Sequence, residues 1–296
     1  MSKQIVTYTP KEYADRLRAS LGAALSGNED EKYAFTPPPE VPEVFEDGLN
    51  LLAGRPAMGK SSLALQAAFQ AAKNVKDGEY VYYISSVFTY DPFWRLLLMC
   101  GVPGAEHYGQ VSFFDPERIA AIGSAVRYLQ DLPIVFIRVR KETLADALET
   151  IPDGASVVFD GFSALYSMYD KPKAYAPAEE ALYSALQHMR SMLVTVGVKR
   201  TVERRKDRVP RPGDLRIGEL FKTADKNVFA LYRAGYYSCG SDDSALLRAY
   251  SCDGKVVDHP MTFGRCFANK YDSKPSESKE QNEGRKGKNG GLLQNK

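Results

Sequence analysis

The residues best suited to chemistry form one short run between Gly54 and Ser61. The run fits the pattern G-x-x-x-x-G-K-[ST] at every fixed position, which is typical of a phosphate-binding loop. In such a loop the backbone N–H groups curl around phosphates, the lysine reaches the β and γ oxygens, and the hydroxyl ligates Mg²⁺. We therefore expect Lys60 to act on the phosphates and Ser61 to bind the metal. The expected phosphate loop comprises Gly54, Arg55, Pro56, Ala57, Met58, Gly59, Lys60, Ser61 and Ser62.

A strand and a helix are expected to hold this loop. The apolar run LNLLAG (49–54) predicts a buried strand that ends at the loop, and SSLALQAAFQAAK (61–73) predicts a helix. The positive end of that helix dipole would point at the phosphates. The alternative is a glycine-containing turn before a core helix, but strand, loop and helix follow one another in the order that phosphate binding requires.

A second element of a phosphate site is a carboxylate beside Mg²⁺, which usually ends an apolar strand. Residues 156–160, SVVFD, read as such a strand, and Asp160 ends it. We expect Asp160 to be both a catalytic residue and a metal ligand. The alternative is that Asp160 only caps the next turn.

Positive charge gathers in residues 199–216, which we call the basic segment. Its cations outnumber its acidic residues, and prolines interrupt it. Such a loop inside a nucleotide-binding domain indicates contact with nucleic-acid phosphates, and a solvated charged loop is the alternative. The candidate DNA-binding residues are Lys199, Arg200, Arg204, Arg205, Arg208, Arg211 and Arg216.

From Leu49 onward, apolar strands alternate with helical patterns, which predicts an α/β fold with a mostly parallel central sheet flanked by helices. Further strands are expected within 79–86, 133–139, 226–237 and 245–252, with a late hairpin over 255–264. Further helices are expected over 91–102, 117–130, 141–151 and 176–193.

The N-terminal residues predict a separate helix. Thr9, Pro10 and Glu12 suit a capping box with proline at the first helical position, and the helix would run from about Pro10 to Leu25. Its apolar stripe must be buried on its own domain or on a neighbouring subunit, and the sequence leaves both open. We expect a docking helix in 1–27, a Pro-rich linker in 28–47, an ATPase domain in 48–271 and a disordered tail in 272–296.

The composition is ordinary for a globular protein. The 296 residues are 44% hydrophobic and 26% charged, and the net charge of +2 predicts no acidic partner by itself. The N-terminus lacks the apolar core of a signal peptide, and no run reaches the roughly 20 apolar residues of a membrane span. The four cysteines show no C-x-x-C spacing, which indicates reduced thiols rather than zinc ligands. We expect a cytoplasmic protein, either bacterial or, for a phage or plasmid protein, in the host cytoplasm.

The phosphate loop and the basic segment together resemble the C-terminal motor domain of DnaB-like replicative helicases, which belong to the RecA-like superfamily. The family pattern R-P-x-M-G-K-[ST] matches residues 55–61, and later motifs match in order, so that the resemblance covers roughly Leu49 to Ala268. The stretch that leads into the loop also resembles plasmid RepA-type single-domain ATPases. The later matching residues are Arg200, Val202, Glu203, Arg205, Pro212, Asp214, Leu215, Arg216, Gly218, Ala224, Asp225, Leu231, Tyr232 and Arg233.

The resemblance implies an ATP-driven DNA helicase motor that works in replication and takes ATP and Mg²⁺. It implies a ring, typically a hexamer, with ATP between neighbours and single-stranded DNA in the centre, held by the basic segment without base readout. A primase or a loading protein is a further partner that the resemblance suggests. Family members also supply an arginine finger to the neighbour's ATP. Arg248 is the candidate here, although the pattern around it differs and a strand-edge charge is the alternative.

Two residues that the family uses in hydrolysis are missing. A glutamate that polarises the attacking water should follow the strand over 79–86, and Val87 stands in its place. A valine cannot accept a proton, and loss of a general base costs a factor of ~100 to 10,000 in rate. Glu179 and Glu180 would substitute only if the fold brings them to the γ-phosphate. Gly197 replaces the glutamine that senses the γ-phosphate, and the strand that should carry it is expected to be short or deleted.

The parts that would bind ATP, Mg²⁺ and DNA are thus more intact than the parts that would hydrolyse ATP. The leading hypothesis is a ring-forming helicase motor. The rival is a catalytically weakened ATP-binding paralogue or an accessory replication factor, which Val87 and Gly197 favour. A third interpretation, a RecA-like recombination or regulatory ATPase, has no support beyond the shared fold.

Overall fold

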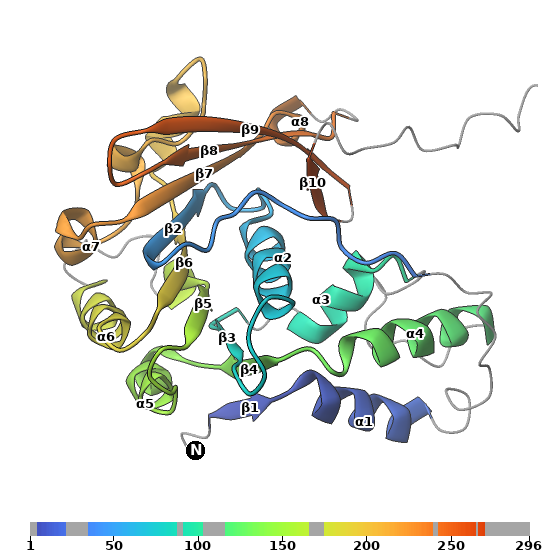
Figure 1. The fold of residues 1–296 in the computed structure, drawn as a ribbon. Coiled ribbons are helices and arrows are strands. Elements are labelled where there is room, and N and C mark those ends of the chain that lie inside the picture. Colours follow the sequence, from blue (N-terminus) through green and yellow to red (C-terminus); the bar gives the residue numbers. More distant parts are fainter. Residues whose placement is uncertain are drawn as a thin grey trace, which may run out of the picture.

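A computed structural model describes residues 5–21, 35–87, 91–102, 116–165, 175–238, 242–264 and 266–269. Its strands are β1 (Val6–Tyr8), β2 (Gly48–Gly54), β3 (Val81–Ser85), β4 (Ile134–Arg138), β5 (Ser156–Asp160), β6 (Ser191–Gly197), β7 (Asn227–Arg233), β8 (Ser244–Tyr250), β9 (Val256–Phe263) and β10 (Phe267–Asn269). They form one ten-stranded sheet in the order β1-β4-β3-β5-β6-β2-β7-β8-β9-β10 (Figure 1). The central strands from β4 to β7 pair in parallel, whereas β1, β8, β9 and β10 pair antiparallel. The expected fold class is therefore confirmed.

Helices cover both faces of the sheet. One face carries α1 (Pro10–Leu21), α2 (Lys60–Ala72), α3 (Pro92–Met99) and α4 (Pro116–Leu129), which share one hydrophobic core. The other carries α5 (Leu144–Glu149), α6 (Ala176–Leu186) and α7 (Glu219–Thr223) in a second core. The short helix α8 (Gly235–Ser238) follows β7, and the 3₁₀ helices are η3 (Lys141–Thr143), η4 (Phe162–Leu165), η6 (Arg200–Arg204) and η7 (Pro212–Asp214). None of these described helices is long and apolar enough to cross a bilayer.

The strand β6 corrects one expectation. Helix α6 ends at Leu186 and not at residue 193, and Ser191–Gly197 forms a complete strand between β5 and β2. The prediction of a short or deleted strand is therefore wrong. The physical reason is burial, since all but the last residue of β6 are buried and its residues pack into both cores. Its β-branched residues suit a central strand, and the connection from α6 needs only a few residues.

The strand β9 corrects a second expectation, that of a hairpin over 255–264. Residues 256–263 form one long strand, which pairs with β8 on one side and with β10 on the other, rather than a hairpin within 255–264. Pro260 fits into this strand because β10 pairs only with Met261, Thr262 and Phe263. The N–H that proline lacks is therefore not needed for the ladder on that side.

The N-terminal helix begins as predicted. The Thr9 hydroxyl accepts from Glu12 N at 3.2 Å, and the Glu12 carboxylate accepts from Thr9 N at 2.8 Å, so the capping box is formed. Ala14 and Leu17 of α1 are buried in the same core as α2. The helix therefore packs on its own chain in this structure. Its predicted extension to Leu25 lies outside the described residues.

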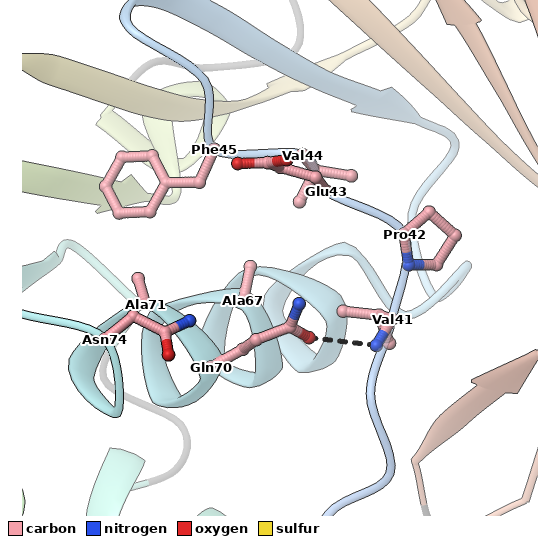
Figure 2. Close-up of a pocket in the computed structure, with 9 residues that line it drawn as sticks. All are labelled: Val41, Pro42, Glu43, Val44, Phe45, Ala67, Gln70, Ala71 and Asn74. Carbon is pink, nitrogen blue, oxygen red and sulfur yellow. Dashed lines mark hydrogen bonds between the residues drawn. The ribbon is translucent and has the colours of Figure 1, made fainter.

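The segment 35–47 has no helix or strand, but it packs closely on α2. Val41 and Val44 are buried in the core, and Val41 N donates to Gln70 Oε1 at 3.0 Å. Figure 2 shows how this segment runs along α2 and encloses a small pocket, lined by Val41, Pro42, Glu43, Val44, Phe45, Ala67, Gln70, Ala71 and Asn74. Residues 28–34 of the expected linker and the expected tail from 272 onward lie outside the described residues.

Gln66, which is buried in the middle of α2, joins distant parts of the chain. Its Nε2 donates to Pro39 O at 2.7 Å and to Phe267 O at 2.6 Å, and its Oε1 accepts from Phe267 N at 3.0 Å. The amide thus binds both the segment before β2 and the last strand, β10.

Candidate nucleotide and DNA site

The phosphate loop connects the end of β2 to the start of α2. Gly59 precedes α2 with φ of 94°, and Ala57 also has a left-handed backbone with φ of 60°. Loops with left-handed residues turn their N–H groups inward and form concavities that bind anions. A side chain at Gly59 would also collide with the ring of Phe267, since a Cβ there would lie 2.9 Å from Cζ. Both the backbone and the packing therefore require glycine at this position.

Lys60 is the first residue of α2, and its side chain turns back over the loop. Its Nζ donates to Gly54 O at 2.9 Å and to Arg55 O at 3.0 Å. Burial, together with the nearby Arg55 guanidinium, lowers the pKa of Lys60 to about 8 against the opposing attraction of Asp160. A half-buried cation held by carbonyl oxygens is stabilised by a bound anion, so this environment suits a phosphate group.

The structure brings Ser61 and Asp160 together from positions far apart in the sequence. Ser61 Oγ donates to Asp160 Oδ1 at 2.9 Å, and Asp160 is only 3% exposed. Thr195 of β6 also donates to Oδ1 at 2.9 Å, and Tyr83 of β3 donates to Oδ2 at 3.0 Å. Burial and the Asp160 charge raise the pKa of Tyr83 well above its usual range, so this phenol stays a donor.

These residues fit a magnesium ion. The Ser61 hydroxyl and the Asp160 carboxylate are oxygen ligands of the kind that Mg²⁺ prefers, and they are already in contact. Helix α2 points its N-terminus at the loop, which favours the negative charge of a triphosphate. The arrangement can therefore hold a metal–triphosphate with Lys60, Ser61 and Asp160 around it.

The position expected for the water-activating glutamate lies beside this centre. Val87 follows β3, and a Cβ placed on Gly161, the residue after Asp160, would lie 2.6 Å from Val87 Cγ2. Val87 therefore occupies space next to the metal-binding candidate without offering a proton acceptor. The described residues give no second carboxylate in contact with Ser61 or Lys60.

Glu179 serves another purpose. This buried carboxylate accepts a hydrogen bond from Gly218 N, at the start of α7, and backbone bonds from Leu220 and Phe221 oppose the rise that burial causes in its pKa. Glu179 thus caps α7 on the opposite face of the sheet from α2. Glu180 is exposed on α6.

At Gly197, where the family resemblance predicts a sensor glutamine, the neighbouring space is filled by Ser163. The Gly197 N–H donates to Ser163 Oγ at 2.7 Å, and a Cβ on Gly197 would lie 2.7 Å from that same oxygen. Gly197 pairs across the sheet with Gly54, the first residue of the phosphate loop. The sensor position is therefore intact as a strand end but carries no side chain of its own.

The phosphate loop is tied to the basic segment through Arg55. Its Nε donates to Glu203 Oε1 at 2.9 Å and its Nη1 to Val198 O at 3.3 Å. Arg55 is the main cause that lowers the pKa of Glu203, and Arg200 adds to it with Nε 3.6 Å from Glu203 Oε2. Glu203 therefore lies between a loop arginine and an exposed arginine of the basic segment.

The cations of the basic segment fall into two groups. Arg205 is half-buried: it forms a two-bond ion pair with Asp214, at 2.9 and 2.7 Å, and helps to close the loop over 205–214. Arg216 donates to Tyr175 OH at 2.9 Å, and Arg208 is half-buried with a left-handed backbone. The exposed group consists of Lys199, Arg200, Arg204, Lys206 and Arg211, of which Lys199 binds Gly213 O and Arg211 binds Asp207.

The structure adds two residues at the phosphate loop that sequence reasoning did not single out for nucleotide binding. Arg233, at the end of β7, lies with its guanidinium 3.8 Å from the centre of the Phe263 ring and donates to Ala57 O at 3.5 Å. Both side chains are partly exposed. A stacked arginine and aromatic ring beside a phosphate loop suit a planar base. The L-Y-R motif was the available signal for Arg233, whereas no local pattern indicated Phe263.

Arg248, the arginine-finger candidate, lies on β8 and pairs across the sheet with Asp258 of β9. The two residues form a two-bond ion pair at 2.5 and 2.7 Å, which raises the pKa of Arg248. Its guanidinium is therefore engaged within the described chain. A role on a neighbour's nucleotide would require this pair to open.

Comparison with known proteins shows which solved structures this chain is similar to. No protein-family model matches the sequence, and no curated protein matches it significantly. By structure, the chain is similar to a DnaB-like replicative helicase that was solved in a study of its interactions with primase, with a TM-score of 0.61 and 20% identity over 76% of this chain. It has the same TM-score, with 21% identity, to a second solved structure, which is an ATPase domain. The chain has the RecA-like fold of DnaB-like helicase ATPase domains.

The likeness to these ATPase domains is broad. The second match covers 75% of this chain and 84% of the solved ATPase domain, whereas the first covers only 58% of the replicative helicase. The DnaB-like fold explains why the phosphate loop, Asp160 and Gly197 meet at one edge, because β2, β5 and β6 are parallel neighbours that end there.

Proposed function

We propose that this protein is an ATP- and Mg²⁺-dependent DNA helicase motor of the DnaB type, which forms a ring on single-stranded DNA during replication. The observation that carries the proposal is the contact of Ser61 Oγ with Asp160 Oδ1 at 2.9 Å, beside a half-buried Lys60. Two residues 99 positions apart in the sequence would not be joined in this way by a simple turn before a core helix. A further partner is a primase or a loader, since a related helicase was solved in a study of its interactions with primase.

The residues would act on the nucleotide as follows. Ser61 and Asp160 would hold Mg²⁺, which when bound neutralises charge on the phosphate oxygens. Lys60 would bind the β and γ oxygens in place of its present carbonyl partners, and the loop N–H groups would hold the remaining charge. Arg233 and Phe263 would hold the base. These residues bind and orient, and an arginine finger such as Arg248 would come from a neighbouring subunit.

The basic segment would hold the DNA backbone. Its exposed cations, among them Lys199, Arg200, Arg204 and Arg211, are available to phosphates, whereas Arg205 and Arg216 support the loop that presents them. Contacts of this kind are independent of base sequence and fall with salt. The hydrogen bonds of Arg55 to Val198 and Glu203 join this segment to the phosphate loop.

A second candidate function is favoured by Val87. With this side chain beside Gly161 and no carboxylate there, the chain would bind ATP well and turn it over slowly. In that case ATP would stabilise an assembly of a catalytically weakened paralogue or accessory replication factor.

Turnover of ATP with and without single-stranded DNA tests the proposal and separates the two candidates. A motor hydrolyses ATP faster when DNA is present, and Lys60→Ala abolishes the reaction. Lys76→Ala, which removes an exposed lysine after α2, is the matched control and leaves turnover unchanged. Nucleotide binding without turnover supports the weakened relative, and absence of Mg²⁺–ATP binding by the folded protein contradicts both.

A further inference from the structure

Ser163 and Gly197 form a fitted pair at the edge of the sheet where the phosphate loop begins. Ser163 Oγ accepts from Gly197 N at 2.7 Å. A Cβ on Gly197 would lie 2.7 Å from that oxygen and 3.5 Å from Ser163 Cβ, so a side chain at 197 would force the hydroxyl to move and break this hydrogen bond. The backbone of Gly197 is not left-handed, so this contact, rather than the torsion angle, accounts for the glycine.

Ser163 is rigidly connected to the metal-binding candidate. It lies in η4, three residues after Asp160, and Ala164 N donates to Gly161 O at 2.7 Å to close the turn. Phe162 is fully buried against Phe221 and Tyr175, with ring centres 5.6 and 5.8 Å away. A displacement at the end of β5 therefore carries Ser163 with it.

Gly197 is equally well connected to the basic segment. Its carbonyl accepts from Arg216 N at 2.8 Å, and the next residue, Val198, pairs with Leu215. Lys199 N then donates to Asp214 O at 2.8 Å. The start and the end of the basic segment are thus hydrogen-bonded to each other next to Gly197, which accepts the bond from Arg216.

We propose that Ser163 is a positioning residue that transmits the state of the nucleotide site to the basic segment. The path runs from Asp160 through η4 to the Ser163 hydroxyl, across one hydrogen bond to Gly197, and on to Arg216. A Mg²⁺ ion bound by Ser61 and Asp160 would attract the carboxylate that now accepts from three donors, and the end of β5 would shift with it. The hydroxyl converts this adjustment into a new position for the DNA-binding loop. The inference rests on the proposed function, because it requires both ligands.

The test is the effect of nucleotide on DNA affinity. The dissociation constant of a fluorescent oligo-dT strand is measured with and without Mg²⁺ and a non-hydrolysable ATP analogue. The full-length wild-type protein is expected to show a change of roughly fivefold or more. In Ser163→Ala each ligand still binds alone, but the ratio of the DNA dissociation constants without and with nucleotide falls to about one. Ser163→Thr, which keeps the hydroxyl, retains the change seen in the wild type. A ratio in Ser163→Ala equal to that of the wild type overturns the inference, as does a wild-type ratio of one when both ligands bind. Failure of the wild type to bind nucleotide or DNA is a different result, which removes the proposed function itself.

One measurement, made on the wild type, keeps the inference testable if Ser163→Ala does not fold. Exchange of the Gly197 amide hydrogen in the wild type should change when Mg²⁺ and the analogue are added, while the Gln187 amide at the end of α6 should not. An unchanged rate at Gly197 overturns the inference. If Ser163→Ala folds, Gly197→Ala should lower the unfolding temperature less in that background than in the wild type, because the clash with Oγ is gone. An equal loss in both backgrounds shows that the contact is not as described.

Discussion

Arg55 of the phosphate loop and Glu203 of the basic segment form an ion pair, with Arg55 Nε 2.9 Å from Glu203 Oε1. The second oxygen of the same carboxylate faces Arg200, whose Nε is 3.6 Å away. One acidic side chain therefore balances a cation on the nucleotide side and a cation on the expected DNA side.

Removal of the Glu203 charge should strengthen DNA binding. Glu203→Gln leaves Arg200 without its neutralising partner, so affinity for single-stranded DNA should rise roughly two- to fivefold at low salt, the size expected for a partly exposed ion pair. Fluorescence anisotropy with oligo-dT across a salt titration measures this. Glu219→Gln on α7, whose partner is Lys222, is the matched control. Equal gains in both variants would mean that only overall charge matters.

Binding of ATP should take up a proton above pH 8. Burial lowers the pKa of Lys60 to about 8 in the free protein, so the side chain is mostly neutral above that pH. A bound triphosphate favours the charged form and raises this pKa, so affinity should fall as pH increases from about 8 to 10. Calorimetry at pH 8.5 in buffers of different ionisation enthalpy measures the proton uptake. In Lys60→Arg the guanidinium stays charged, and uptake should disappear; equal uptake in both proteins would assign the proton elsewhere.

Two adjacent arginines should respond differently to truncation. Arg204 is exposed, so Arg204→Ala should weaken DNA binding, reduce the salt dependence by about one counterion and leave stability unchanged. Arg205→Ala removes the partner of Asp214 and should lower the free energy of unfolding by about 1–3 kcal/mol, less than for a fully buried pair. Thermal unfolding and DNA titration on both variants check this. Salt-dependent DNA binding that survives loss of Arg204, Arg205 and Arg211 together would contradict the assignment of the basic segment.

A carboxylate at position 87 should accelerate hydrolysis. Val87 is next to Gly161, directly after Asp160, and Val87→Glu places a proton acceptor there. ATP turnover should increase by ~100-fold, the lower end of what a general base provides. Val87→Gln has nearly the same shape without the basicity and is the control. No gain over Val87→Gln would indicate that water is activated from another position or that the geometry is unsuitable.

Much of the fold could be predicted because its patterns are local. The capping box at Thr9, the strand before the phosphate loop and the helix after it are each encoded within a few neighbouring residues. Strand β6 was missed because residues 191–193 continue an apolar pattern that also suits α6. These residues form a strand because they are buried between β5 and β2, which the local pattern does not show. The same holds for β9, where a hairpin was expected over 255–264 and only the pairing with β8 and β10 shows one continuous strand.

In the candidate site, too, the local motifs could be predicted and the contacts between distant residues could not. The phosphate loop is contiguous, and Asp160 could be named because it ends a strand. The contacts around them join residues far apart: Tyr83 and Thr195 to Asp160, Ser163 to Gly197, and Phe263 to Arg233. No periodicity or spacing predicts such pairs, because they depend on which strands become neighbours.

The amide of Gln66 determines where this chain can safely be shortened. Because Gln66 binds both Pro39 and Phe267, and the Phe267 ring covers Gly59, the flanks of the domain are stapled onto the helix that begins at Lys60. A C-terminal deletion that includes Phe267 would leave the buried Gln66 amide without two of its hydrogen bonds. It would also remove the ring that packs against Gly59, the residue before this helix. Expression boundaries and fusion points therefore belong before β1, which pairs with β4, or after Asn269.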